Sequence, residues 1–321
     1  MRKKYIFMFS GQGSQFYHMG EDLYENNLDF RENMLELDKY ARELTGKSVV
    51  ECMFQKEKRK SDSFDDLPMT HLAIFMVEYS MAQIMQKQGI QPDYVLGMSL
   101  GEFASLAVSK VITAVEAMHY IHTQAEVIIK NCGYGGMITI IDDYHIFEQY
   151  PELYNNSELA AVNFATHFVI SCNEENIHFI AKFLKEKSIL HVVLPVKYGF
   201  HSYYMDEAKW DYIEFLKDKK FGEPVVKVAS CYYGGWLDQI SQSFLWDVVR
   251  GKMNIGSVVK LLEDNTSEGE NVYLDLGPSG TMATIVKNCL SKDSQSKVEG
   301  IITLFGKETD RFNKIIEIYG Q

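Results

Sequence analysis

Apolar and polar positions divide this chain into short apolar runs and longer amphipathic stretches. The run Tyr5 to Phe9 is typical of a buried parallel strand. The stretches Asp29 to Leu44, Thr70 to Gln88 and Val115 to Ile129 have the apolar spacing of helices. Strands and helices that alternate in this way predict an α/β fold with a mostly parallel sheet.

The alternation becomes closer between residues 130 and 197. This texture predicts a small α+β subdomain inserted into a main domain of residues 1–129 and 198–321. In the subdomain we expect strands at 137–141, 159–162, 167–171 and 191–196, a helix at 174–187, and a helical or irregular segment at 144–153. After it we expect helices at 204–217, 244–262 (broken near Gly251) and 281–290, and strands at 225–230, 271–276 and 301–305.

A serine flanked by glycines connects a strand to a helix near residue 99. Tyr94 to Leu96 is typical of a buried strand, and the five residues from Gly97 to Gly101 form a Gly-x-Ser-x-Gly pattern around Ser99. Glu102 to Val108 then continues as a helix-forming run. This context predicts a nucleophile elbow, a sharp turn that presents the serine oxygen at a helix N-terminus. An ordinary glycine-rich turn with a capping serine stays open as the alternative.

The first strand leads into the loop Ser10 to Gln15, which contains two glycines. A loop at the carboxyl end of a strand places backbone N–H groups where a ligand can meet them. The loop is neither a dinucleotide fingerprint, since the third glycine is missing, nor a P-loop, since Gly-Lys-Ser/Thr is absent.

Composition narrows the class of protein further. The net charge is −12 and no basic stretch is interleaved with aromatics, which disfavours nucleic-acid binding. The five cysteines are widely spaced without CxxC pairs, as expected for free thiols in a reducing cytoplasm. No apolar run has the length of a signal peptide or membrane span, so we expect a cytoplasmic protein that does not enter a membrane. The pair His119 and His122 lacks a third ligand nearby, so no metal site is predicted.

Four motifs occur in one order along the chain: Gly-Gln-Gly-Ser-Gln after the first strand, Gly-x-Ser-x-Gly-Glu, Phe-His-Ser near residue 200 and Leu-Gly-Pro near residue 277. Together they resemble the malonyl-CoA:acyl-carrier-protein transacylases and the acyltransferases of polyketide synthases, nearly end to end. Within that family the chain looks most similar to the stand-alone, PksD-type proteins of bacillaene-like polyketide clusters. The resemblance implies an α/β-hydrolase-like core with a ferredoxin-like subdomain, and no cofactor.

The resemblance also implies roles for individual residues. Ser99 would be the nucleophile that takes an acyl group from a thioester, and His201 its general base. The backbone N–H groups of Gln12 and Leu100 would form the oxyanion hole. A backbone carbonyl, at Val248 by alignment, would hold the second imidazole nitrogen.

The acyl pocket would include Met98, Gln124, Asn163 and Phe200, and two of these depart from the family pattern. Gln124 stands where the family carries an arginine that binds the malonyl carboxylate. A malonyl group there would lack its charged partner, at a cost of about 3–5 kcal/mol. Met98 replaces a histidine and makes the pocket rim more apolar. Both changes favour an uncharged acyl group. For Asn163, a turn-forming role is an equal explanation.

Two activities follow from one acyl-enzyme. The first is a trans-acting acyl hydrolase that removes groups such as acetyl from acyl-carrier-protein thioesters. The alternative is an acyltransferase that moves an acyl group from coenzyme A to a carrier protein. A non-catalytic carrier-protein binder is disfavoured by the intact Ser99 and His201. An ordinary esterase is disfavoured because about 120 residues follow His201, whereas esterases carry this histidine near the C-terminus.

The partners implied are an acyl carrier protein and an acyl thioester on that carrier or on coenzyme A. An acidic carrier needs local positive charge on an acidic protein. The candidate bases are Lys56, Lys58, Arg59, Lys60, Lys217, Lys219 and Lys220, for which a solvated surface is the alternative interpretation.

Overall fold

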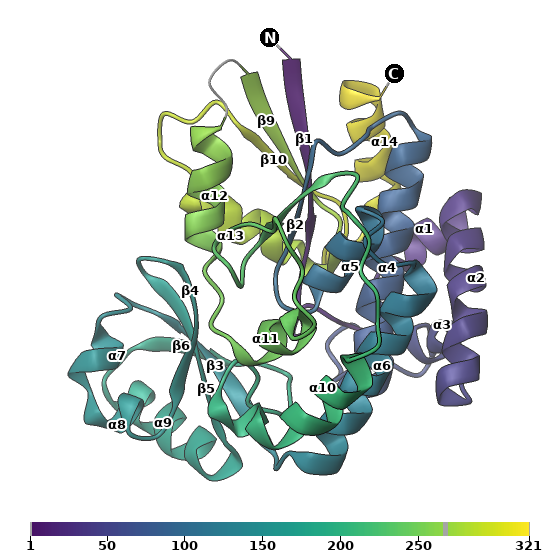
Figure 1. The fold of residues 1–321 in the computed structure, drawn as a ribbon. Helices are drawn as coiled ribbons and strands as arrows, with labels where there is room; N and C mark the ends of the chain where they lie inside the picture. The colour runs from purple at the N-terminus through teal and green to yellow at the C-terminus, as the bar shows by residue number, and fades with distance from the viewer. Residues whose placement is uncertain (1, 266–268, 321) are drawn as a thin grey trace.

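A six-stranded sheet forms the centre of the larger part of the molecule, in the order β10-β9-β1-β2-β7-β8 (Figure 1). The structure, a computed structural model, describes residues 2–265 and 269–320. Neighbouring strands are parallel except for the antiparallel pair β7–β8 at one edge. The carboxyl ends of the five parallel strands therefore meet at one edge of the sheet. The strands are β1 (Arg2–Phe9), β2 (Tyr94–Gly97), β7 (Lys227–Ser230), β8 (Gly235–Trp236), β9 (Gly269–Asp275) and β10 (Lys297–Gly300).

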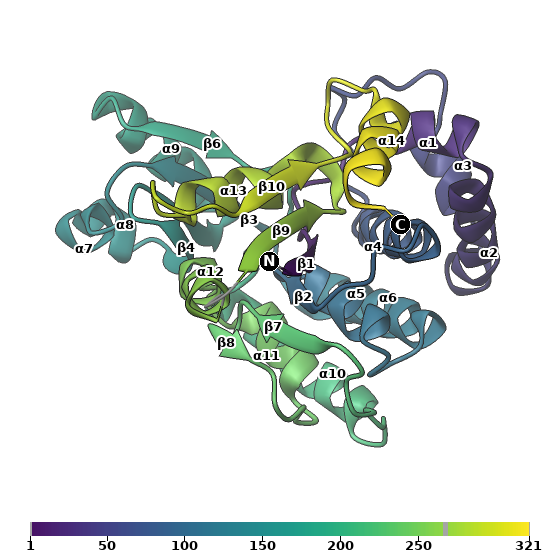
Figure 2. The ribbon, with the colours of Figure 1, turned by 90° about the horizontal axis from the view of Figure 1, so that it is seen from above.

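Helices cover both faces of this sheet, with α4, α5 and α6 on one side and α12 and α13 on the other (Figure 2). The helix α4 is buried on almost every side, which explains its continuous apolar sequence. The helices before the subdomain are α1 (Glu21–Asn26), α2 (Leu28–Thr45), α3 (Val49–Met53), α4 (Leu67–Lys87), α5 (Gly101–Val108) and α6 (Ala114–Asn131). Those after it are η1 (Tyr203–Ala208), α10 (Lys209–Leu216), α11 (Phe244–Arg250), α12 (Ile255–Asp264), η2 (Pro278–Gly280), α13 (Thr281–Cys289) and α14 (Glu308–Tyr319).

A second sheet, in the order β4-β5-β3-β6, lies apart from the first and is antiparallel throughout (Figure 1). It has a small apolar core of its own, which includes Ile138, Phe168 and Ile180. All of its strands lie within the range 130–197. Its elements are β3 (Gly135–Ile141), α7 (Ile146–Gln149), α8 (Pro151–Tyr154), β4 (Glu158–Phe164), β5 (His167–Asn173), α9 (Glu174–Glu186) and β6 (Leu190–Val193).

The predicted α/β fold with a mostly parallel sheet is confirmed, but the last strand was misplaced. The strand β10 is Lys297–Gly300, whereas 301–305 comes after it as irregular chain. Ile301 and Ile302 are fully buried there, so their apolar character reflects core packing without strand pairing. The predicted helix at 204–217 is a 3₁₀ segment followed by the short helix α10.

Candidate active site

Ser99 occupies a tight turn between β2 and α5. Its φ is 56°, a left-handed conformation that is uncommon for residues other than glycine. The flanking glycines make this turn possible. A Cβ atom on Gly97 would lie 2.6 Å from the nitrogen of Glu102, and one on Gly101 would lie 2.2 Å from the carbonyl oxygen of Phe9. Close backbone approach therefore requires glycine at both positions.

Glu102 fixes the turn to the neighbouring strand. The side chain is fully buried, and its Oε1 accepts hydrogen bonds from the Ser230 hydroxyl (2.8 Å) and the Tyr232 N–H (3.4 Å). Burial raises the pKa of the Glu102 carboxyl to about 8, and the hydrogen bonds act in the opposite direction. The group is therefore neutral at pH 7, and it joins the start of α5 to the end of β7.

The loop Ser10 to Gln15 lies beside Ser99 because β1 and β2 end together. Phe9 pairs with Gly97 in the parallel register. A Cβ atom on Gly11 would lie 2.9 Å from the Cβ of Ser99, so the two loops are in direct contact. Glu78 of α4 anchors the loop, because its Oε1 accepts from the Ser10 N–H (2.5 Å) and hydroxyl (2.9 Å).

Two backbone N–H groups are free at this point of the fold. Among the described residues, neither the N–H of Gln12 nor that of Leu100 donates a hydrogen bond to another group. Leu100 is the residue before α5, where the helix dipole favours negative charge. Both groups are thus available to donate to a ligand, as the N–H groups of an oxyanion hole do.

His201 lies against Ser99. The Ser99 Oγ is 2.8 Å from the Nε2 of His201, and the Nδ1 is 2.9 Å from the carbonyl oxygen of Gly251. Because a carbonyl only accepts, Nδ1 carries the proton, and Nε2 is left to accept the proton of Ser99. The backbone N–H of His201 also donates to the carbonyl of Val249 (2.9 Å).

The prediction that Val248 orients His201 needs correction. The hydrogen bond from Nδ1 goes to Gly251, three residues later, and the Val248 carbonyl gives a second, smaller favourable interaction. The reason is geometric. The last carbonyls of a helix have no partner within it, and His201 lies across the C-terminal end of α11, where Val248 and Gly251 both present their oxygens.

Burial dominates the titration of His201. The side chain is 4% exposed, and burial lowers its pKa to about 4, while the Gly251 and Val248 carbonyls act in the opposite direction. The imidazole is therefore neutral at pH 7, which is the state that a general base needs.

A cavity of about 70 Å³ opens beside Ser99 and His201, between the two sheets. Most of its wall is apolar, and none of the described residues that line it has a charged side chain. Met98, Asn163 and Phe200 contribute to it as predicted, whereas Gln124 does not. The lining residues are Gly11, Gln12, Met98, Ser99, Met137, Ala161, Asn163, Val169, Leu194, Phe200, His201 and Met253.

Gln124 lies in the core next to this wall-forming set. It is 3% exposed, and the nearby hydroxyl of Tyr212 on α10 donates to the carbonyl of Tyr120 (3.1 Å). The Nε2 of Gln124 has no hydrogen-bond partner among the described residues. The position that the alignment assigns to the family's arginine is thus buried, neutral and outside the cavity wall.

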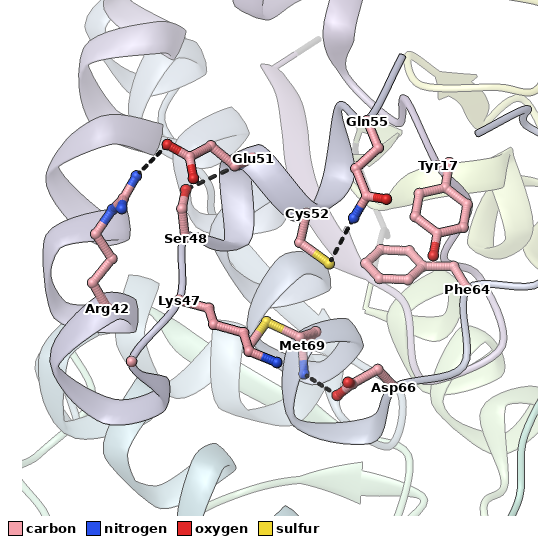
Figure 3. Close-up of a pocket in the computed structure, with 11 residues that line it drawn as sticks. Tyr17, Arg42, Lys47, Ser48, Glu51, Cys52, Gln55, Phe64, Asp66 and Met69 are labelled. Atoms are coloured by element: carbon pink, nitrogen blue, oxygen red, sulfur yellow. Dashed lines mark hydrogen bonds and ion pairs between the residues drawn. The ribbon is translucent and has the colours of Figure 1, made fainter. Parts of the chain in front are cut away.

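A larger, open pocket of about 550 Å³ lies away from Ser99, between α2, α3 and the start of α4 (Figure 3). Its polar groups bind one another: Arg42 pairs with Glu51, Gln55 bonds Cys52, and Asp66 accepts from the N–H of Met69. No histidine is among the described residues that line it, so the thiol of Cys52 has no imidazole beside it. The described lining of this pocket therefore does not support a nucleophilic site.

Other classes of site have no support in the described part of the chain. No group of three or more His, Cys, Asp or Glu side chains in residues 2–265 and 269–320 is arranged to hold a metal ion. Within the same ranges, no helix has the length and apolar character needed to cross a membrane.

An elbow serine, a neutral histidine and two free N–H groups thus lie around one small cavity, and these are the kinds of group that acyl transfer by a serine nucleophile uses. Comparison with known proteins agrees. Residues 6–318 match the acyl transferase domain family, and the chain belongs to this family. It is 43% identical over 315 residues to the "polyketide biosynthesis acyltransferase homolog PksD" of Bacillus subtilis, covering 98% of this chain and 96% of that one. It is 40% identical, with the same coverage, to the homologue BaeD of Bacillus velezensis.

Solved structures show the same fold. The acyltransferase domain from the second module of the salinomycin polyketide synthase superposes with a TM-score of 0.84 at 21% identity, over 98% of this chain and 72% of that one. The crystal structure of MCAT from Streptococcus pneumoniae gives a TM-score of 0.79 at 18% identity, over 98% of this chain and 100% of that one.

Several residues of the site were not found by sequence reasoning. Gly251 is one of them, although the predicted helix break at this glycine was a usable signal. Glu78 anchors the Gln12 loop from a helix that looks like continuous core. Met137, Leu194 and Met253 line the cavity from segments far apart in sequence, and no local pattern marks them.

Proposed function

We propose that this protein is an acyl hydrolase of polyketide biosynthesis, which removes uncharged acyl groups such as acetyl from acyl-carrier-protein thioesters. Two relatives with at least 40% identity carry the description of polyketide biosynthesis acyltransferase homologues. The single observation that carries the choice of substrate is the cavity at Ser99, which has no charged side chain in its lining.

The absence of a cation from the lining decides between acyl groups. A malonyl group ends in a carboxylate, and a carboxylate buried without a partner loses its hydration without compensation. An acetyl group carries no charge and fits a small apolar wall. Chain extension uses the loss of the malonyl carboxylate as CO₂, and an acetyl group has no such carboxylate. Removal of the acetyl group therefore frees the carrier to be loaded again.

The geometry supports the following first half of the reaction. Nε2 of His201 takes the proton of Ser99, whose Oγ attacks the thioester carbonyl carbon. The oxyanion accepts hydrogen bonds from the N–H groups of Gln12 and Leu100, each worth a few kcal/mol of barrier. The C–S bond then breaks, and the thiolate leaves with the proton from Nε2. An acyl ester on Ser99 and a free carrier thiol remain.

The second half distinguishes the two candidate functions. In a hydrolase, water attacks the acyl ester and releases a free acid. In an acyltransferase a thiol attacks instead, and this alternative is favoured by membership of the acyl transferase domain family. Both routes use His201 as the base.

The carrier is expected to meet the basic run in the loop between α3 and α4. Lys58 and Lys60 lie over the rings of Tyr17 and Phe16, in the segment that comes after the Gln12 loop. Arg59, between them, is exposed. On the other candidate surface, Lys219 likewise lies over the ring of Phe215, but Lys217 is paired with Glu214, which neutralises part of the charge there.

The finer description of the fold belongs to the same proposal. The order βαββαβ and the sheet β4-β5-β3-β6 support a ferredoxin-like subdomain at 130–197. The six-stranded sheet takes its strands from both sides of the segment 130–197, which supports an α/β-hydrolase-like domain over 1–129 and 198–321.

The test is to mix the purified protein with acetyl- and malonyl-loaded carrier proteins and to follow the masses of both proteins over time. We expect rapid loss of acetyl from the carrier, release of acetate and little loss of malonyl. The matched control is Ser99→Ala, which removes one oxygen and should abolish acyl loading.

Two outcomes would contradict the proposal. Acyl loading that persists in Ser99→Ala would remove Ser99 as the nucleophile. Gain of malonyl by an empty carrier from malonyl coenzyme A, with acetyl carriers left intact, would make the protein a supplier of extender units.

A further inference from the structure

Asn163 is one of two amide side chains in the cavity lining, with Gln12, that the first half of the reaction does not use. It is 3% exposed, near the end of β4, and lines the cavity together with Ser99 and His201. Its Nδ2 lies 2.9 Å from Nδ1 of His167. Because an amide nitrogen only donates, this contact makes Nδ1 the acceptor and orients the amide.

The other atom of the amide is free. Asn163 Oδ1 is buried and accepts no hydrogen bond from the described residues. A buried amide oxygen without a partner costs on the order of 1–3 kcal/mol, so an isolated orphan on an apolar wall needs an explanation. A ligand that donates a hydrogen would remove this cost.

The backbone holds Asn163 in a fixed relation to the catalytic histidine. Met253 donates its N–H to Ala160 of β4 (2.9 Å), and its carbonyl accepts from the N–H of Val162 (3.3 Å). Met253 lies two residues beyond Gly251, whose carbonyl orients His201. The strand that carries Asn163 and the segment that aims His201 are therefore parts of one hydrogen-bonded unit.

We propose that Oδ1 of Asn163 positions the water that hydrolyses the acyl ester on Ser99. This inference rests on the proposed hydrolase function and assigns it a positioning residue. The water donates one hydrogen to Oδ1 and the other to Nε2 of His201, which has become a free base again after the thiol has left. Its oxygen attacks the acyl carbonyl carbon, and the proton passes to Nε2. When the C–Oγ bond breaks, Ser99 Oγ takes that proton and the free acid leaves.

A thiol acceptor does not need this hydrogen bond. A thiol has a single S–H, which goes to Nε2, and nothing remains to donate to Oδ1. The residue should therefore act on the competition between water and thiol, more than on the formation of the acyl-enzyme.

The experiment measures that competition directly. The intact protein is given the acetyl thioester of N-acetylcysteamine in ¹⁸O-water together with pantetheine, and labelled acetate and acetyl-pantetheine are quantified. In Asn163→Leu, which is similar in volume but has no acceptor, we expect the ratio of hydrolysis to thiol transfer to fall by about tenfold. Asn163→Ala repeats the test with a smaller side chain, should the leucine variant fail to fold.

Two further variants sharpen the result. Asn288→Leu makes the same exchange at an exposed position of α13, and its ratio should match that of the wild type. Gln12→Leu tests the other free acceptor in the lining, Oε1 of Gln12.

Each outcome is decisive. An unchanged ratio in both Asn163 variants, or a fall confined to Gln12→Leu, overturns the role of Asn163 and leaves the hydrolase proposal intact. A wild-type acyl-enzyme that survives water and passes only to pantetheine overturns the hydrolase function, and the assignment of Asn163 falls with it.

Discussion

The titration of His201 makes a quantitative prediction about the pH dependence of acyl-enzyme formation. The pKa of this buried imidazole is lowered from 6.5 to about 4. A shift of this size corresponds to about 3 kcal/mol of preference for the neutral form. At pH 5.5, a histidine with the ordinary pKa would be about nine-tenths protonated, whereas one with a pKa of about 4 stays almost wholly neutral. We therefore expect kcat/KM for acylation at pH 5.5 to stay within about twofold of its value at pH 7.

The assay is acylation of Ser99 by a small acetyl thioester between pH 4 and 8, because kcat/KM reports the free enzyme. Circular dichroism at each pH confirms that the protein is folded. An acid limb of kcat/KM near pH 6.5 in folded protein would contradict the reasoning, since it would mean that burial does not govern this histidine.

The same shift has a consequence for stability, and its sign is fixed. His201 becomes protonated below pH 6.5 in the unfolded chain, but only near pH 4 in the folded protein. The stabilising contribution is present above pH 6.5 and is lost as the pH falls toward 4, by about 3 kcal/mol at most. His201→Gln should remove this part of the pH dependence of the free energy of unfolding, measured by urea denaturation.

Three substitutions give further expected outcomes. Gly101→Ala should lower the free energy of unfolding by about 1–3 kcal/mol and slow acyl loading, because the new Cβ atom would meet the Phe9 carbonyl. Gly133→Ala is the control, since its Cβ atom would have nothing within 4 Å. Equal melting temperatures of the two variants would refute the close approach at Gly101. In the wild type, the free energy of unfolding should fall between pH 5 and 8, because the folded protein keeps a proton on Glu102 (pKa about 8) that the unfolded chain loses. Glu102→Gln, which cannot ionise, should make this fall smaller in urea denaturation. An unchanged dependence on pH would contradict the prediction. Gln124→Arg should cost about 3–5 kcal/mol of stability and raise the malonyl-to-acetyl loading ratio seen by mass spectrometry. An unchanged ratio would show that this position does not reach the acyl group.

The parts of the site that sequence could predict are those written in short local motifs. The elbow at Ser99 and the loop with Gln12 each begin at the carboxyl end of a strand, and their glycines are needed for close backbone contacts. Because β1 and β2 pair in parallel, both strands end at the same edge of the sheet, and the two loops that follow them lie side by side. The Phe-His-Ser motif likewise drew attention to His201, whose Nε2 lies 2.8 Å from the Oγ of Ser99.

The parts that could not be predicted depend on which surfaces meet in three dimensions. Alignment indicated Val248 as the orienting carbonyl, but the choice of Gly251 depends on how the end of α11 faces His201. Likewise, apolar character at Ile301 and Ile302 indicated a strand, while burial is satisfied there without one. The cavity wall is assembled from both sheets, so residues such as Met137 and Leu194 have no common sequence signal.

The arrangement of the second sheet has a consequence for catalysis beyond covering the site. Through Met253, β4 is hydrogen-bonded to the segment that carries Gly251, and through the Phe200 carbonyl, Ser171 of β5 is bonded to the residue before His201. His201 is thus held from the second sheet as well as from the segment at the end of α11. A shift of the second sheet relative to the first would therefore change the Oγ–Nε2 distance and the cavity together. Coupling of these two quantities means that substitutions in β4 or β5, even outside the cavity, should affect nucleophile activation and acyl-group preference in parallel.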